Sequence, residues 1–177
     1  NQRHQKKNIR KGLDHILFVL GLFLSFLNFR SLLFQVTAFT LAHSITLVLA
    51  GMGWIELERT IIEPLIALSI IWIAIENCVF KKPSKWRFLV VFIFGLIHGM
   101  GFAAVLSNYG IPKDNFLSSL LAFNLGVEIG QLSILIIAFI LARLILKKNW
   151  RNKQLRIPAS IMIGLIGFFW LIERLLN

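Results

Sequence analysis

Three histidines lie inside long apolar stretches of this chain, where a polar side chain costs free energy and needs a reason. His15 directly follows Asp14, His43 lies among hydroxyl-bearing residues, and His98 lies between glycines. Imidazoles with one or two carboxylates form a ligand set for zinc, nickel, cobalt or iron, and this chemistry does not choose among them. The sequence therefore predicts a metal site of His15, His43 and His98, with Glu128 and Asp14 as carboxylate ligands.

A second group of polar residues shares helical faces with these ligands. Thr40 and Ser44 flank the second histidine, and Asn124 and Gln131 lie about one turn to either side of Glu128. We expect them to orient the ligands or to bind the ion weakly. Hydroxyl and amide groups also join membrane helices by hydrogen bonds, so helix packing is the alternative interpretation.

Glu76 and Asn77 lie further along the third apolar stretch, toward the end away from the histidines, and Ser69 shares a face with Glu76. Counting the helical rise from the expected end of each stretch places the second and third histidines in one layer with Asn124 and Glu128. The same count places His15 closer to the membrane surface. We expect Glu76 and Asn77 to form a second position on a path across the membrane.

Four glycines are expected to permit close approach between helices. Gly95 and Gly99 are four residues apart around the third histidine, and Gly126 and Gly130 have the same spacing around Glu128. Small residues at this spacing make a flat helix face against which another backbone can pack.

The elements that position these residues are apolar stretches of membrane-spanning length. The chain is 57% hydrophobic with a mean hydropathy of +0.77, more than a water-facing surface can carry. A helix crosses the hydrocarbon core with about 20 apolar residues. Such stretches run from Leu13 to Phe29, Leu32 to Met52, Ile61 to Phe80, Trp86 to Leu106, Phe116 to Leu146, and Ile157 to Leu176. We predict an all-α, polytopic transmembrane bundle of about six helices.

Basic residues outnumber acidic ones by 19 to 8, and many lie in two clusters next to apolar stretches. Such clusters flank membranes, so we expect the lipid bilayer as a partner and no nucleic acid. The metal ion expected from the histidines is the other partner. Alternate loops differ in Lys and Arg content, which places the richer loops in the cytoplasm and both termini outside the plasma (inner) membrane. Residues 1–11 are expected to be a charged extracytoplasmic segment at the end of a longer precursor region, followed by a transmembrane domain over residues 12–177. Self-association into a homo-oligomer stays open.

The chain has one cysteine, Cys78, which excludes an intrachain disulfide and a cluster of thiolate ligands. Without thiolates, copper(I) is a poor candidate for the metal. The fourth histidine, His4, lies in the charged start of the chain and is expected to be solvated.

Five blocks of sequence carry a resemblance that covers almost the whole chain. They are GLDHILF at 12–18, TAFTLAHS at 37–44, EPLIALS at 63–69, FGLIHGMGF at 94–102 and FNLGVEIGQ at 123–131. In these blocks the chain resembles the HupE/UreJ family of membrane proteins, most closely its second branch. The resemblance implies a nickel or cobalt permease associated with hydrogenase and urease maturation. The better-studied branch has a histidine where this chain has Asn8, so a site here has one imidazole fewer.

Two other functions stay open. An intramembrane metal-dependent hydrolase or oxygenase would use the three histidines as ligands and Glu128 as a general base on bound water. A non-catalytic anchor or accessory protein for an upstream domain would use the polar residues only as contacts between helices. Polar residues that continue to Glu76 and Asn77 favour a permease, so a transporter is expected rather than an enzyme.

Overall fold

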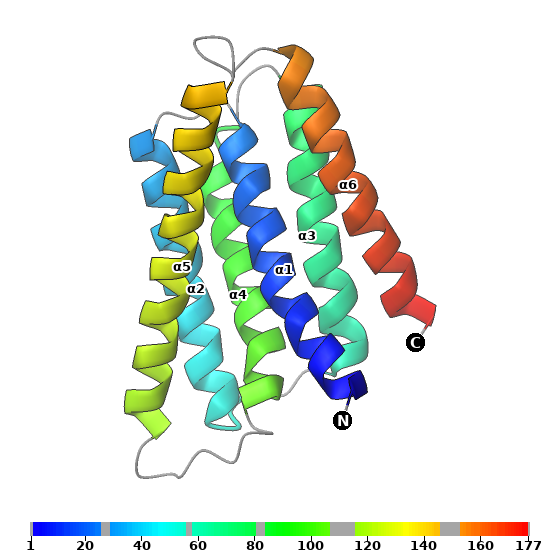
Figure 1. Ribbon diagram of the computed structural model, residues 1–177. Helices are drawn as coiled ribbons and strands as arrows, with labels where there is room; N and C mark the ends of the chain where they lie inside the picture. The colour runs from blue at the N-terminus through cyan, green and yellow to red at the C-terminus, as the bar shows by residue number, and fades with distance from the viewer. Residues whose placement is uncertain are drawn as a thin grey trace.

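The computed structural model describes residues 2–25, 29–55, 58–80, 84–106, 116–145 and 153–176. Within these ranges the regular secondary structure consists of six α-helices (Figure 1). They are α1 (Gln2–Leu24), α2 (Phe29–Gly51), α3 (Arg59–Val79), α4 (Arg87–Leu106), α5 (Phe116–Ile145) and α6 (Lys153–Leu176). The predicted all-α bundle of about six helices is confirmed.

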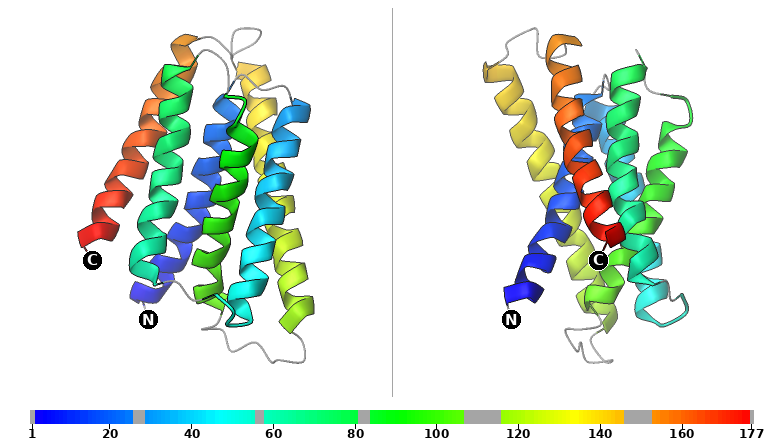
Figure 2. Two further views of the ribbon diagram at one scale, coloured as in Figure 1. Left: turned by 180° about the vertical axis from the view of Figure 1, so that it is seen from behind. Right: turned by 90° about the vertical axis from the view of Figure 1, so that its right-hand side faces the viewer.

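The helices form a bundle in which α1 is central. Four helices pack side by side in a row, in the order α2, α4, α3 and α6 (Figure 1). The other two, α1 and α5, pack against one face of this row. α5 packs chiefly against α1 and α2, so much of its surface faces outward. The start of α1 and the end of α6 lie at the same end of the bundle, as an even number of crossings requires (Figure 2).

Several helices have the length and composition of membrane spans. In the described residues, Phe29–Gly51, Arg59–Val79, Ser118–Leu144 and Leu155–Leu176 are long and apolar enough to cross a bilayer. The other two helices contain the shorter apolar segments Gly12–Leu24 and Arg87–Phe102. The chain is thus a helical membrane protein, because only a helix satisfies its own backbone hydrogen bonds across hydrocarbon.

Many large apolar side chains face outward from the bundle, unlike in a water-soluble protein, while several polar side chains are buried. On α5, Leu121, Leu125 and Ile129 are 56% to 61% exposed, whereas Asn124 and Gln131 are at most 7% exposed. Lipid accepts exposed leucine without cost, but a polar group on that face would have no hydrogen-bonding partner. The polar side chains therefore gather inside the bundle.

The closest helix contact is that between α2 and α4, and two of the predicted glycines make it possible. A Cβ atom at Gly95 would meet the backbone oxygen of Phe39, and one at Gly99 would overlap the backbone oxygen of His43. In contrast, no atom of the described residues lies within 4 Å of a Cβ built at Gly126 or Gly130. Within one chain, the expectation that these two α5 glycines pack against another helix is not met.

The first helix differs most from its expected bounds. It begins at Gln2 instead of Leu13 and ends at Leu24, and α2 begins at Phe29, within the expected loop. Lys, Arg and Gln are good helix formers, so the helix continues from the apolar stretch into the charged segment 1–11. Apolarity marks the part of a helix that suits lipid and does not mark where the helix itself begins.

Two other expectations on element boundaries can be compared with the structure. α6 begins at Lys153, four residues before its expected start, and contains Pro158. The long fifth stretch is one unbroken helix. The side chains of His4 and Asn8 lie outside what the structure describes. So do residues 107–115 and 146–152, which include most of the two expected loops 108–115 and 147–156.

Candidate functional site

The three histidines of the predicted site come together from three helices. The ring centre of His15 on α1 is 5.3 Å from that of His43 on α2 and 4.9 Å from that of His98 on α4. His43 and His98 are 0% and 1% exposed. We refer to these three residues as the histidine layer.

The expected depth of His15 was wrong. Its ring contacts those of both other histidines, so it lies in their layer and not nearer the surface. The error follows from the helix start, because α1 begins eleven residues before the apolar stretch, at Gln2 rather than Leu13. His15 therefore lies several turns inside α1.

The ring spacing can be compared with that of a metal site. Two imidazoles bound to one tetrahedral ion, with metal–nitrogen distances of about 2 Å, have ring centres about 5 Å apart. The two observed distances match this value. However, among the described residues no group of three or more His, Cys, Asp or Glu side chains is arranged to hold a metal ion as it stands. For the rings to share an ion, they would have to rotate about their side-chain bonds.

Three ring nitrogens of the histidine layer, in His43 and His98, are buried without a described hydrogen-bond partner. Within the described part of the chain, neither nitrogen of His43 has a partner, and Nδ1 of His98 has none. A buried polar atom without a partner costs about 1–3 kcal/mol, so most such atoms in proteins are satisfied. Ligand-binding sites are one place where this cost is accepted.

Ser69 on α3 sets the orientation of His98. The Ser69 hydroxyl donates to the backbone oxygen of Ile66 at 2.7 Å, and its oxygen lies 2.9 Å from Nε2 of His98. A hydroxyl has one proton, and a carbonyl can only accept. With the Ser69 proton on the Ile66 carbonyl, Nε2 of His98 donates to Ser69, and Nδ1, the nitrogen without a described partner, carries the lone pair. Sequence reasoning paired Ser69 with the face of Glu76 and missed this contact.

Phenylalanine rings surround the histidine layer. Phe39 contacts all three imidazoles, with ring centres 5.1 to 6.1 Å apart, and Phe18 lies 5.4 Å from His98. Phe102 lies 6.3 Å from both His15 and His43. Aromatic walls exclude water and lower the local dielectric constant, which strengthens any charge interaction in the layer.

The polar residues of α5 lie differently from one another. Gln131 accepts a hydrogen bond of 3.0 Å from the Thr40 hydroxyl, and the side-chain oxygen of Asn124 is buried without a described partner. Glu128 is half-buried, and within the described residues no recorded hydrogen bond or ion pair joins it to the imidazoles. Ser44 donates to the backbone oxygen of Thr40 and therefore serves its own helix.

Asp14 forms an ion pair that the sequence did not indicate. Both of its carboxylate oxygens lie 2.8 Å from Nη2 of Arg174, near the end of α6. Nη1 of Arg174 donates to the backbone oxygen of Glu63, and its guanidinium lies over the Trp170 ring. The spacing of Trp170 and Arg174, one helical turn apart, could have indicated the contact between the guanidinium and the ring. It does not indicate the pairing with Asp14.

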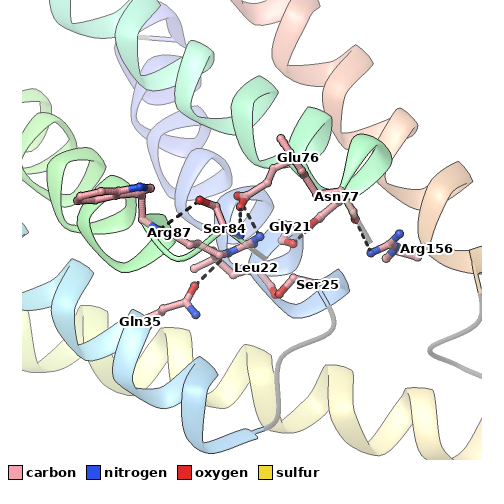
Figure 3. Close-up of polar contacts among 11 residues, drawn as sticks. Gly21, Leu22, Ser25, Gln35, Glu76, Asn77, Ser84, Arg87 and Arg156 are labelled. Atoms are coloured by element: carbon pink, nitrogen blue, oxygen red, sulfur yellow. Dashed lines mark hydrogen bonds and ion pairs between the residues drawn. The ribbon is translucent and has the colours of Figure 1, made fainter. Parts of the chain in front are cut away.

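At the other end of the bundle, the Glu76 carboxylate is also bound by an arginine (Figure 3). Glu76 accepts a hydrogen bond of 3.0 Å from Arg87 Nη1 and another of 3.0 Å from the backbone N–H of Ser84. Nε of Arg87 donates to the side-chain oxygen of Gln35. We call Gln35, Glu76, Ser84 and Arg87 the arginine cluster.

Asn77 lies beside the arginine cluster and joins two helices. Its side-chain amide donates a hydrogen bond of 2.7 Å to the backbone oxygen of Gly21 on α1 (Figure 3). Arg156 of α6 donates to the backbone oxygen of Phe80 nearby. These contacts bring α1, α3 and α6 together at this end of the bundle.

Comparison with known proteins gives one match. Neither a curated protein nor a solved structure matches the chain. The family model described as HupE / UreJ protein matches residues 4–174, which include both polar regions and all of the six helices except the first two residues of α1 and the last two of α6. The chain therefore belongs to the HupE/UreJ family of membrane proteins.

Proposed function

We propose that the chain is a membrane permease or channel for a divalent transition-metal ion, which binds in passing at the histidine layer. Nickel and cobalt are the first candidates because the family is associated with their transport, and zinc and iron fit the same ligands. The membrane is the plasma (inner) membrane, with both termini outside.

The observation that carries this proposal is the set of buried ring nitrogens without partners in His43 and His98. A structural histidine in a membrane bundle would be expected to hydrogen-bond across helices, as Thr40 and Gln131 do. The His15 ring lies at metal-site spacing from each of the other two rings, and a cation that completes the nitrogens without partners explains this arrangement better.

The other polar residues have roles along the same path. Asp14 attracts the ion to the layer, and Glu128 with Asn124 and Gln131 provides oxygen atoms on the α5 side. Glu76 and Asn77 act where the ion leaves, toward the cytoplasm. Ligands that must turn to bind together suit a permease, because a transport site has to release its ion as readily as it binds it.

The proposal is tested by the metal content of the full chain purified in detergent. The wild type, His43→Ala and His98→Ala are equilibrated separately with nickel(II), cobalt(II), zinc(II) and iron(II), and bound metal is measured by elemental mass spectrometry. His4→Ala is the matched control, because it removes an imidazole from the charged start of the chain.

We expect near-stoichiometric binding of at least one metal by the wild type and by His4→Ala, and loss of binding in the other two variants. Uptake of that metal into liposomes then separates a permease from an enzyme or an anchor, which would bind without transport. If the wild type binds no more metal than a folded His43→Ala/His98→Ala double variant, the proposed site is wrong.

A further inference from the structure

The ion pair between Asp14 and Arg174 lies directly beside the histidine layer. Asp14 precedes His15 in the chain, and His15 contacts both other imidazoles. Successive residues on a helix point about 100° apart, so α1 presents His15 to α2 and α4 while Asp14 reaches α6. One turn of α1 thus joins the imidazoles to a buried acid and base.

Arg174 is held by more than its carboxylate partner. Its side chain is 11% exposed, Nη1 donates to the backbone oxygen of Glu63 at 2.9 Å, and the guanidinium lies 5.6 Å from the centre of the Trp170 ring. Three different contacts fix the position of the positive charge. The Arg174 guanidinium therefore has a fixed position in the folded protein.

Stability alone is a weak reason for such a pair. A buried ion pair must overcome the cost of desolvating both charges, and apolar residues of the same volume often stabilise a protein equally well. The pair does matter for a cation in the histidine layer. With neutral imidazoles, the Asp14 carboxylate would attract a divalent ion and the Arg174 guanidinium would repel it, in surroundings where charges interact strongly.

We propose that Arg174 is an internal competitor of the transported cation, holding the Asp14 carboxylate when no ion is bound and weakening the binding of the ion that enters. The inference rests on the proposed function and adds to it a residue that tunes affinity. The metal ion draws Asp14 away from Arg174 on arrival, and the guanidinium retakes the carboxylate as the ion leaves. A permease needs this second step, because a carboxylate left to the metal alone would retain it.

The test is the nickel(II) affinity of the full chain in detergent, measured by equilibrium dialysis for the wild type, Arg174→Gln, Arg174→Lys and Asp14→Asn. We expect Arg174→Gln to bind nickel roughly tenfold more tightly and Asp14→Asn roughly tenfold more weakly, as removal of one nearby charge implies. Arg174→Lys keeps the charge and should stay close to the wild type. The matched control is Arg143→Gln, which removes an exposed positive charge at the far end of α5 and should leave the affinity unchanged.

A purely structural pair would give a different result. Arg174→Gln would then bind nickel equally or less well while remaining folded, and that outcome overturns the inference. If Arg174→Gln does not fold, the neutral pair Asp14→Asn/Arg174→Gln replaces it, and it must bind nickel more tightly than Asp14→Asn alone. Failure of the wild type to bind any metal that His43→Ala loses would instead count against the proposed function.

Discussion

The histidine layer and the arginine cluster are both buried and polar, but the charged groups of the cluster pair with each other, although Nη2 of Arg87 has no described partner. In the arginine cluster, Glu76 accepts hydrogen bonds from Arg87 and from the backbone of Ser84. In the histidine layer, three ring nitrogens of His43 and His98 have no described partner. The arginine cluster supplies its own cation, whereas the histidine layer presents lone pairs to one that comes from outside.

This difference teaches how the bundle separates stability from binding. The arginine cluster joins α2, α3 and α4 through charged hydrogen bonds, which are about twice as strong as neutral ones. The histidine layer is held in place by close packing of α2 against α4 at Gly95 and Gly99. Changes in the first region should therefore affect folding most, and changes in the second should affect metal binding most.

The largest effect on stability should come from breaking the arginine cluster. Glu76→Ala leaves the Arg87 guanidinium buried at 3% exposure without its counter-charge. Loss of one partner from a buried pair typically costs about 3–5 kcal/mol. Unfolding in a denaturing detergent measures the change, with the exposed Glu58→Ala as the control that removes a carboxylate outside the cluster. A loss equal to that of the control would show that the pair contributes nothing to the fold.

A smaller loss is expected where the histidine layer depends on close packing. Gly99→Ala places a methyl group against the backbone oxygen of His43 and the Thr46 hydroxyl, neither of which can move away freely. Such overpacking costs about 1–3 kcal/mol and should also weaken nickel binding by displacing His43. The matched change Gly126→Ala meets open space in the same kind of helix and should be neutral or slightly stabilising. Equal effects at the two glycines would contradict the α2–α4 packing described above.

Ser69 provides a way to weaken the site without disturbing the fold. Ser69→Ala removes the acceptor that keeps the His98 proton on Nε2 and the lone pair on Nδ1. Loss of a group that orients a metal ligand typically lowers metal affinity by about 10–100-fold. Nickel dialysis measures the loss, and Ser69→Thr, which keeps a hydroxyl, should recover part of the affinity. Unchanged affinity in Ser69→Ala would mean that His98 needs no fixed tautomer.

Much of the fold could be predicted because lipid imposes a simple rule on the sequence. A helix that crosses hydrocarbon must be apolar over most of its length, so the apolar stretches located the helices and left their polar residues conspicuous. His43 and His98 stood out for this reason, and the structure places them in one layer with His15. Helix ends outside lipid obey no such rule, which is why the start of α1 was missed.

The partners of the two acids could not be predicted in the same way. Asp14 and Arg174 lie near opposite ends of the chain, and Glu76 meets Arg87 across a turn between two helices. Neither pairing follows a helical period, and both arginines lie near helix ends, where the sequence gives them an ordinary explanation as charges flanking a membrane. The packing of α6 against both α3 and α1 brings Arg174 to Asp14.

The smallest expected effect is also the one with the opposite sign. His43→Leu replaces a buried ring whose two nitrogens have no described partner with an apolar side chain that occupies the same core. Removing unsatisfied polar atoms should stabilise the metal-free protein by about 1 kcal/mol, although it abolishes metal binding. Unfolding of the metal-free variant and the metal-free wild type measures the difference, and Thr46→Val is the control, because Thr46 donates to the backbone oxygen of Leu96 and should lose stability. A metal-free His43→Leu protein less stable than the wild type would mean that His43 serves the fold, and the contrast between an open layer and a closed cluster would then fail.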